Sequence, residues 1–427
     1  MSTHANVIQI TTHDSGRHFG CFGHPTLNTP ALDQLAAEGI RFGNYFCTAP
    51  ICSPSRATQL TGLYPQTHGM LDLPCFGWRM RPEVRHASHR FKDSGYQTVL
   101  FGLQHEVPKS DLPALAFDEV RPVQENAEIL AAEVAAFLRQ PESRQQPFYA
   151  QVGFVETHTP FSRGQNLPDQ EKGLEIPPYL ADTPMAREAM AGFQGAVKRV
   201  DRAVQTILEA LHDSGLEENT LLVFTTDHGL EMPRAKWHLY DAGIEIAMIM
   251  RFPAAGLAGG RVCPMLLSNV DYLPTVLGLL GLTVPEGLDG IDFSDAVASG
   301  RPSLGREAVF SLYHKTHTRS IRTGTHKLIR HFDNASDFHR VPVRYEDCLN
   351  KRVIPEVELF DLVADPNEFE NLSDRPELAE VQRRLDDQLW RWLQDVVDPV
   401  LQGPVRSPSY ELAIRDYDQW RRQATAP

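Results

Sequence analysis

The chain has 427 residues, of which 42% are hydrophobic, which is enough for one large core and a smaller second unit. Its formal net charge of −14 argues against nucleic acid and anionic membrane surfaces as partners, because both would repel it. The six cysteines form no CxxC pair, so neither a zinc knuckle nor a disulfide framework is predicted. The first residues show no secretory leader pattern and no apolar run reaches membrane-spanning length, so we expect a cytoplasmic location.

Strands and helices alternate through the first 300 residues. Apolar runs predict strands, in chain order, at 6–11, 98–102, 148–154, 220–226 and 247–252. Helices are predicted from Pro30 to near Gly39, from the segment after Cys52 with Ser53 or Ser55 as N-cap, and at 126–140, 187–214 and 271–280. This alternation predicts an α/β fold with a mostly parallel sheet and helices on both faces.

The pattern changes near Pro302. Short strands are predicted within 305–332 and at 357–361, followed by an amphipathic helix over 376–397. We therefore expect a catalytic domain over 1–302 and a smaller α+β unit with an antiparallel sheet over 303–399. Residues 400–427 lack clear periodicity and are interpreted as an arm that packs on a partner subunit, so a homo-oligomer, most simply a dimer, is predicted.

Polar residues follow the carboxyl ends of several predicted strands: His13-Asp14, His105, His158 and Asp227-His228. In open parallel sheets ligands bind at that edge. Any one of these residues alone is more simply a cap or a core residue. Four separate chain crossings that deliver such side chains to one edge predict a single polar site.

The most specific stretch is Cys52-Ser53-Pro54-Ser55-Arg56-Ala57, followed by Leu60-Thr61-Gly62. A helix starting there would place free N–H groups and the fixed cation of Arg56 beside Cys52, an arrangement that suits an anion. For an isolated cysteine, a buried structural role is the simpler interpretation. The full run, however, resembles the signature of the type I sulfatases.

That resemblance implies an alkaline-phosphatase-like fold and a specific chemistry. In this family a separate formylglycine-generating enzyme oxidises the motif cysteine to formylglycine, an aldehyde whose hydrate serves as the nucleophile. The family also holds one divalent metal ion, and here the corresponding positions are His13, Asp14, Cys52, Asp227 and His228. Imidazoles replace family carboxylate and amide ligands at two of these, so we leave the ion open between Ca²⁺ and Mn²⁺.

The resemblance also assigns roles around the sulfate. Arg56 would orient the nucleophile, His105 would take a proton during release, and His158 would contact or protonate the leaving group. Lys236 matches a sulfate-binding lysine. A second family lysine is absent, since that position holds Leu103. We predict that the neighbouring Gln104 donates a hydrogen bond to the sulfate in its place.

Within the family, the chain resembles the heparan N-sulfatase branch and its shorter bacterial relatives. We expect hydrolysis of small sulfate monoesters such as aryl sulfates. Three alternatives stay open: N-sulfoglucosamine hydrolysis, phosphonate or phosphate ester hydrolysis, which the Asp227-His228 pair favours, and a catalytically silent metal-binding scaffold, which the missing lysine favours.

Overall fold

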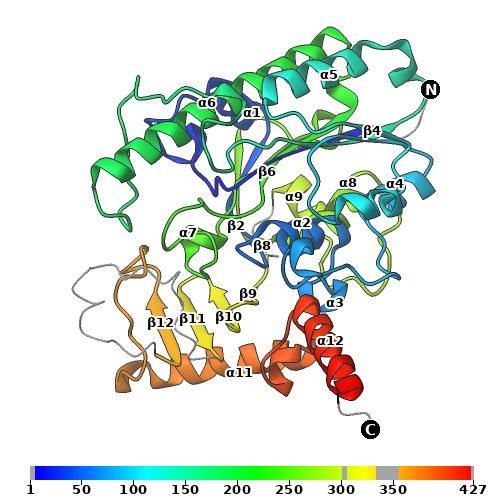
Figure 1. The fold of residues 1–427 in the computed structure, drawn as a ribbon. Helices are drawn as coiled ribbons and strands as arrows, with labels where there is room; N and C mark the ends of the chain where they lie inside the picture. Colours follow the sequence, from blue (N-terminus) through cyan, green and yellow to red (C-terminus); the bar gives the residue numbers. More distant parts are fainter. Residues whose placement is uncertain (1–4, 301–304, 333–354, 425–427) are drawn as a thin grey trace.

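The computed structural model describes residues 5–300, 305–332 and 355–424. These residues form two sheets (Figure 1), and the larger has eight strands in the order β4-β3-β5-β1-β6-β7-β2-β8. Its strands are β1 Asn6–Thr12, β2 Ile40–Phe46, β3 Gln97–Gly102, β4 Glu119–Arg121, β5 Phe148–Gly153, β6 Thr220–Thr226, β7 Met248–Arg251 and β8 Arg261–Ser268. All pairings are parallel except those of β7, which runs antiparallel to β6 and β2. The predicted mostly parallel sheet is confirmed.

Helices cover both faces of this sheet. One face carries α1 Pro30–Glu38, α5 Ala127–Arg139 and α6 Pro184–Asp213, and the other carries α2 Cys52–Thr61, α4 Ala87–Asp93 and α8 Tyr272–Leu279 (Figure 1). The short helices are α3 Pro65–His68, α7 Asp241–Ile244 and α9 Ser294–Ser299. Every residue of β1 and β6 is buried, as expected for central strands covered on both sides.

The helix boundaries follow local capping. α1 begins with Pro30 at its first position and ends at Gly39, as predicted. α6 begins three residues earlier than predicted, because Thr183 caps its N-terminus by accepting a hydrogen bond from the Ala186 N–H.

The predicted N-cap of α2 is wrong. The structure places Ile51 there, so Cys52 is the first helical residue rather than Ser53 or Ser55. The Ser55 hydroxyl is used elsewhere, donating a hydrogen bond to the Asp227 carbonyl at 2.5 Å. A tertiary contact has therefore taken the side chain that would otherwise cap the helix.

The smaller sheet is antiparallel, in the order β12-β11-β10-β9. Its strands are β9 Ala308–Tyr313, β10 Thr318–Thr323, β11 His326–His331 and β12 Val357–Asp361, and α11 Ala379–Asp395 packs on it through Leu385, Leu389 and Trp392. The predicted strands and helix of this unit are confirmed. The domain boundary that we predicted between residues 302 and 303 lies outside the described residues, and so does Cys348.

The small sheet contacts segments close to the edge of the large sheet where the predicted polar residues lie. The Leu312 N–H donates to the Thr48 carbonyl at 2.8 Å, four residues before Cys52. The Lys327 ammonium lies 2.5 Å from Asp241 and donates to the Leu239 carbonyl at 3.1 Å. The two sheets are thus joined through the chain on either side of that edge.

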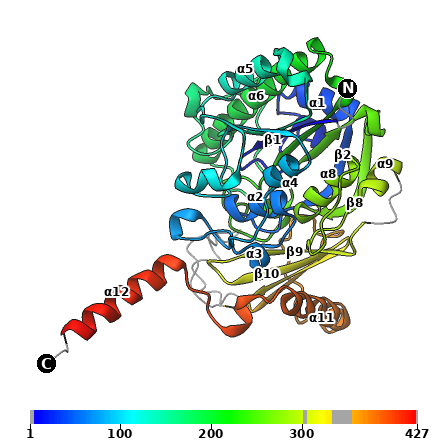
Figure 2. The same cartoon turned by 90° about the vertical axis from the view of Figure 1, so that its right-hand side faces the viewer.

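The C-terminal arm is helical, which the sequence pattern did not reveal. α12 Pro408–Ala424 extends away from the rest of the molecule (Figure 2), and none of its residues with a described side chain is buried. Its role in a dimer stays a prediction. Among the residues that the structure describes, no helix is both long enough and apolar enough to span a bilayer.

Candidate active site

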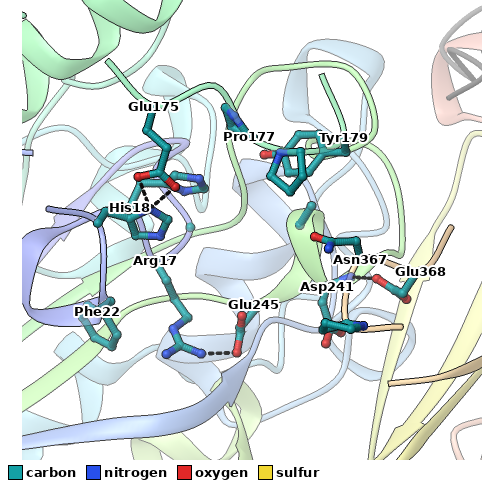
Figure 3. A pocket seen from close by; sticks show the side chains of 15 residues that line it. Arg17, His18, Phe22, Glu175, Pro177, Tyr179, Asp241, Glu245, Asn367 and Glu368 are labelled. Atoms are coloured by element: carbon teal, nitrogen blue, oxygen red, sulfur yellow. Dashed lines mark hydrogen bonds and ion pairs between the residues drawn. The ribbon is translucent and has the colours of Figure 1, made fainter. Parts of the chain in front are cut away.

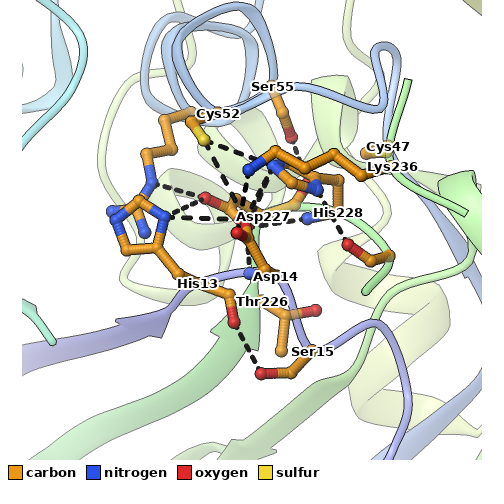
Figure 4. Close-up of polar contacts among 12 residues, drawn as sticks. His13, Asp14, Ser15, Cys47, Cys52, Ser55, Thr226, Asp227, His228 and Lys236 are labelled. Atoms are coloured by element: carbon orange, nitrogen blue, oxygen red, sulfur yellow. Dashed lines mark hydrogen bonds and ion pairs between the residues drawn. The ribbon is translucent and has the colours of Figure 1, made fainter. Parts of the chain in front are cut away.

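The ends of β1 and β6 build the centre of the site. These strands pair in parallel with Thr12 opposite Thr226, so the residues that follow them leave the sheet side by side. The His228 Nε2 atom lies 3.1 Å from the Asp14 Oδ1 atom. The His13 Nδ1 atom lies 3.2 Å from the Asp227 Oδ2 atom (Figure 4). The residues after β1 and β6 thus meet at one edge, as the sequence predicted, and all four side chains are buried.

Helix α2 brings the cysteine and the arginine to the same place. The Cys52 Sγ atom lies 3.3 Å from the His228 Nε2 atom and 4.0 Å from the Asp14 Oδ1 atom (Figure 4). The Arg56 Nε–H donates to the Asp227 Oδ2 atom at 2.9 Å. Residues 52 and 56 are one helical turn apart, so both project from the same face of α2. Because Cys52 is the first helical residue, the N–H groups of Cys52 and Ser53 have no acceptor within the helix, whereas Pro54 has no N–H and Ser55 already donates to the Ile51 carbonyl.

The charges of the site are strongly coupled. Burial would raise the pKa of Asp227, but His228 and Arg56 hold it well below its ordinary value. Burial also opposes ionisation of Cys52, yet Lys236 and His228 bring the pKa of its thiol well below 9. The pKa of His13 is raised to about 10: burial and Arg56 lower it, and the carboxylates of Asp227 and Asp14 together outweigh them. The site therefore holds anionic carboxylates within a shell of cations.

The donor set fits a divalent cation. One ligand atom from each of His13, Asp14, Cys52 and Asp227 lies within 4.8 Å of the others. Both ring nitrogens of His13 are buried without a hydrogen-bond partner, although Nδ1 is only 3.2 Å from a carboxylate oxygen. Buried polar atoms that converge without bonding one another are typical of metal ligands, and mixed carboxylate and imidazole donors suit such an ion.

Three further side chains surround this centre. The Lys236 Nζ atom donates to the Asp14 Oδ2 atom at 2.8 Å. The rings of His105 and His158 lie 5.0 Å and 5.4 Å from the His13 ring, measured between centroids. These two histidines follow β3 and β5, which are neighbours in the sheet. The structure therefore gathers every predicted catalytic and metal-binding residue at one edge.

Gln104 is placed differently. Its amide nitrogen donates to the Val107 carbonyl at 2.9 Å, and its amide oxygen accepts from the Val107 N–H at 3.0 Å. These bonds close a local turn after β3, next to Leu103. The predicted contact between Gln104 and sulfate stays a prediction.

Sequence reasoning missed two polar residues at the site. Asn269 follows β8, donates to the Ser55 carbonyl at 3.0 Å and accepts from the Thr48 N–H at 3.1 Å, so it fixes the start of α2. Its position after a strand was the available signal, but β8 was not predicted. Glu231 lies 3.5 Å from Lys236 and 3.6 Å from the His158 Nδ1 atom, and no sequence motif marked it.

A separate cavity of about 330 Å³ is lined on one side by Gly16, two residues past Asp14 (Figure 3). None of the residues around Cys52 lines it. Arg17 forms an ion pair with Glu245, and His24 lies 3.3 Å from Glu175. Because these charges on its walls are already paired, we assign this cavity no role in the chemistry around Cys52.

Two family models match the chain. The Sulfatase model matches residues 5–282. The model for the C-terminal part of N-sulphoglucosamine sulphohydrolase matches residues 234–395, so the two overlap in the segment that carries Lys236.

Similar proteins agree with these matches. An ulvan-active sulfatase from Formosa agariphila is 28% identical, over 92% of this chain and 75% of its own length. The N-sulphoglucosamine sulphohydrolase of Homo sapiens is 26% identical, over 93% of this chain and 92% of its own length. Among solved structures, a putative sulfatase from Bacteroides fragilis superposes with a TM-score of 0.77 at 24% identity, covering 95% of this chain and 99% of its own. A phosphonate monoester hydrolase from Silicibacter pomeroyi superposes with a TM-score of 0.71 at 20% identity, covering 93% and 96%. These two structural likenesses bear on the fold alone.

Proposed function

Because the chain belongs to the sulfatase family and is a sulfuric ester hydrolase, we propose that it cleaves small sulfate monoesters at a metal centre next to a modified Cys52. The observation that carries this proposal is the position of the Cys52 Sγ atom, 3.3 Å from His228 and 4.0 Å from Asp14. A nucleophile at residue 52 would thus lie against the residues that fit a cation.

The groups of the chain divide the chemistry among them. Formylglycine at position 52 would supply the nucleophilic oxygen, and a divalent cation held by His13, Asp14, Asp227 and His228 would polarise the sulfate oxygens. Arg56 holds the Asp227 carboxylate in place through its 2.9 Å hydrogen bond. The Lys236 ammonium and the first N–H groups of α2 offset charge on the sulfate oxygens.

Proton transfer falls to the two histidines. The His158 Nδ1–H donates to the Thr159 carbonyl at 2.8 Å, which leaves Nε2 as the atom that faces Asp14. A proton on Nε2 would be delivered to the leaving oxygen. His105, beside His13, is the base that we propose for the proton lost during release of sulfate. Because Leu103 occupies the position of one family lysine, Lys236 is the lysine that we propose to bind the sulfate group.

The substrate and the ion are the finer parts of the proposal. The net charge of −14 favours a small monosulfate over a long polyanion, and aryl sulfates are the simplest probes. Two buried imidazoles, His13 and His228, favour Mn²⁺ over Ca²⁺. N-sulfoglucosamine is the second candidate substrate, because a family model for an N-sulphoglucosamine sulphohydrolase matches the C-terminal part of the chain.

The test is a comparison of three substrates with protein co-expressed with a formylglycine-generating enzyme. We expect turnover of an aryl sulfate to exceed that of an aryl phosphonate and of glucosamine N-sulfate, and Cys52→Ala to abolish it while the far-UV circular dichroism is unchanged. Mass spectrometry of the peptide containing residue 52 should show the aldehyde.

Two results would contradict the proposal. An unmodified thiol at residue 52 in a sample that turns over the aryl sulfate would exclude the formylglycine nucleophile. No turnover of any of the three substrates, with aldehyde and metal both present, would favour the scaffold alternative.

A further inference from the structure

Glu231 is an acidic residue at a site built to bind an anion. It lies four residues past Asp227, and its side chain is 18% exposed whereas those of Asp14 and Asp227 are fully buried. Its Oε2 atom accepts the Thr159 hydroxyl at 2.6 Å and lies 3.5 Å from the Lys236 Nζ atom. A carboxylate in that position weakens the attraction of Lys236 for sulfate, so its presence calls for another role.

The neighbours of Glu231 do not need it for neutralisation or orientation. Lys236 has a nearer carboxylate partner, the Asp14 Oδ2 atom at 2.8 Å. His158 already donates its Nδ1–H to the Thr159 carbonyl at 2.8 Å, whereas Glu231 is 3.6 Å from that nitrogen. A bound cation is also disfavoured, although Asp14, His158 and Glu231 have metal-like spacing, because the Lys236 ammonium lies between the two carboxylates.

One oxygen of Glu231 is left over. Its hydrogen bond to Thr159 and its ion-pair distances to His158 and Lys236 are given by Oε2, and within the described part of the chain Oε1 takes part in no hydrogen bond. The partly exposed side chain lies next to His158, on the side where the leaving group would sit. A charged acceptor at this point would bond a hydroxyl or ammonium group of the substrate and would repel a second anion.

We infer that Glu231 is a specificity-determining residue, which selects sulfate esters with a hydrogen-bond donor beside the scissile sulfate and rejects those with a neighbouring carboxylate or second sulfate. This inference rests on the proposed function, since it concerns the leaving group of the same reaction. It also agrees with the net charge of −14, which disfavours polyanionic substrates as a whole.

Three aryl monosulfates test it: phenyl sulfate, 2-hydroxyphenyl sulfate and 2-carboxyphenyl sulfate. Each variant is compared with the wild type on the same compound, so that the intrinsic reactivity of each ester cancels. Relative to phenyl sulfate, Glu231→Gln should raise kcat/KM for the carboxylate compound about tenfold and lower that for the hydroxyl compound severalfold. Glu231→Asp, which keeps the charge, should still discriminate against the carboxylate.

Glu175→Gln is the matched control, because it removes one partly exposed carboxylate at the separate cavity and should leave all three ratios unchanged. If Glu231→Gln changes kcat/KM by the same factor for all three esters, Glu231 acts only through Lys236 and the inference is overturned. If wild-type enzyme with the aldehyde and metal turns over none of the esters, the proposed function fails instead, so the two failures are distinguishable.

Discussion

Replacing Lys236 with methionine isolates the contribution of one cation to sulfate binding and turnover. The side chain is 4% exposed, so methionine of similar length fills the space without a charge. Two unit charges about 4 Å apart interact by about 4 kcal/mol at the effective dielectric constant of a protein site. Loss of one preorganised electrostatic group at an active site costs about 10²–10³-fold in rate, or about 2.7–4 kcal/mol. We therefore expect kcat/KM for an aryl sulfate to fall about 10²–10³-fold.

The loss should be divided between kcat and KM, because the sulfate oxygens are already anionic before reaction. Metal content should not fall, since the Asp14 carboxylate, 2.8 Å from the lost ammonium, becomes freer to bind a cation. Steady-state kinetics and elemental analysis of the purified variant measure both quantities. Lys198→Met, which removes a lysine of α6 that is paired with Glu171, is the matched control and should stay within about twofold of the wild type. A metal-loaded, folded Lys236→Met enzyme within fivefold of the wild type would refute the role of this lysine.

Three further predictions follow from other parts of the structure. His13→Asp makes the proposed metal site richer in carboxylate, so competition binding should shift from Mn²⁺ toward Ca²⁺, and an unchanged preference would show that His13 is not a ligand. The Arg319 guanidinium donates to the Asp398 carboxylate at 2.6 Å and 2.8 Å, and both side chains are fully buried. Arg319→Met leaves this carboxylate without its cation, so urea unfolding should show that the free energy of unfolding falls by about 3–5 kcal/mol. A fall of less than about 1 kcal/mol would contradict this. Burial raises the pKa of Asp201 to about 6, and hydrogen bonds from the Leu32 and Ala31 N–H groups offset part of this rise. Between about pH 4 and 6 the folded chain therefore binds more protons than the unfolded chain, so the wild type loses stability as pH rises through that window. Asp201→Asn removes this dependence, so urea unfolding should show the variant gaining up to about 3 kcal/mol on the wild type between pH 4 and 7, and a difference independent of pH would exclude the explanation.

The elements that the sequence predicted well carry their signals locally. Thr29, Pro30 and Gly39 mark both ends of α1. The residues after β1 and β6 are charged or imidazole side chains that directly follow two mainly apolar strands, each ending in Thr-Thr. Because parallel neighbours end at the same edge, the position of these residues along the chain was enough to predict that they meet.

The missed elements depend on contacts between distant segments. β2 contains Arg41, Gly43 and Asn44, which interrupt its apolar pattern, and it is held by β7 and β8 on either side. β8 contains Pro264, which an edge strand tolerates. The antiparallel direction of β7 follows from how the chain returns after α7, and the composition of the strand does not encode it. Glu231 belongs to the site through its contacts with Thr159, His158 and Lys236, which no spacing in the sequence reveals.

The bonds between the two sheets have a consequence for how this enzyme could diversify. The small sheet holds the Thr48 carbonyl, four residues ahead of Cys52, and through Lys327 it holds the loop that follows Lys236. It is therefore a structural support for the site around Cys52, and removing it would release both of those segments at once. Variants of the small sheet are therefore expected to keep the bonds to Thr48 and to the loop after Lys236, whatever else changes in that unit.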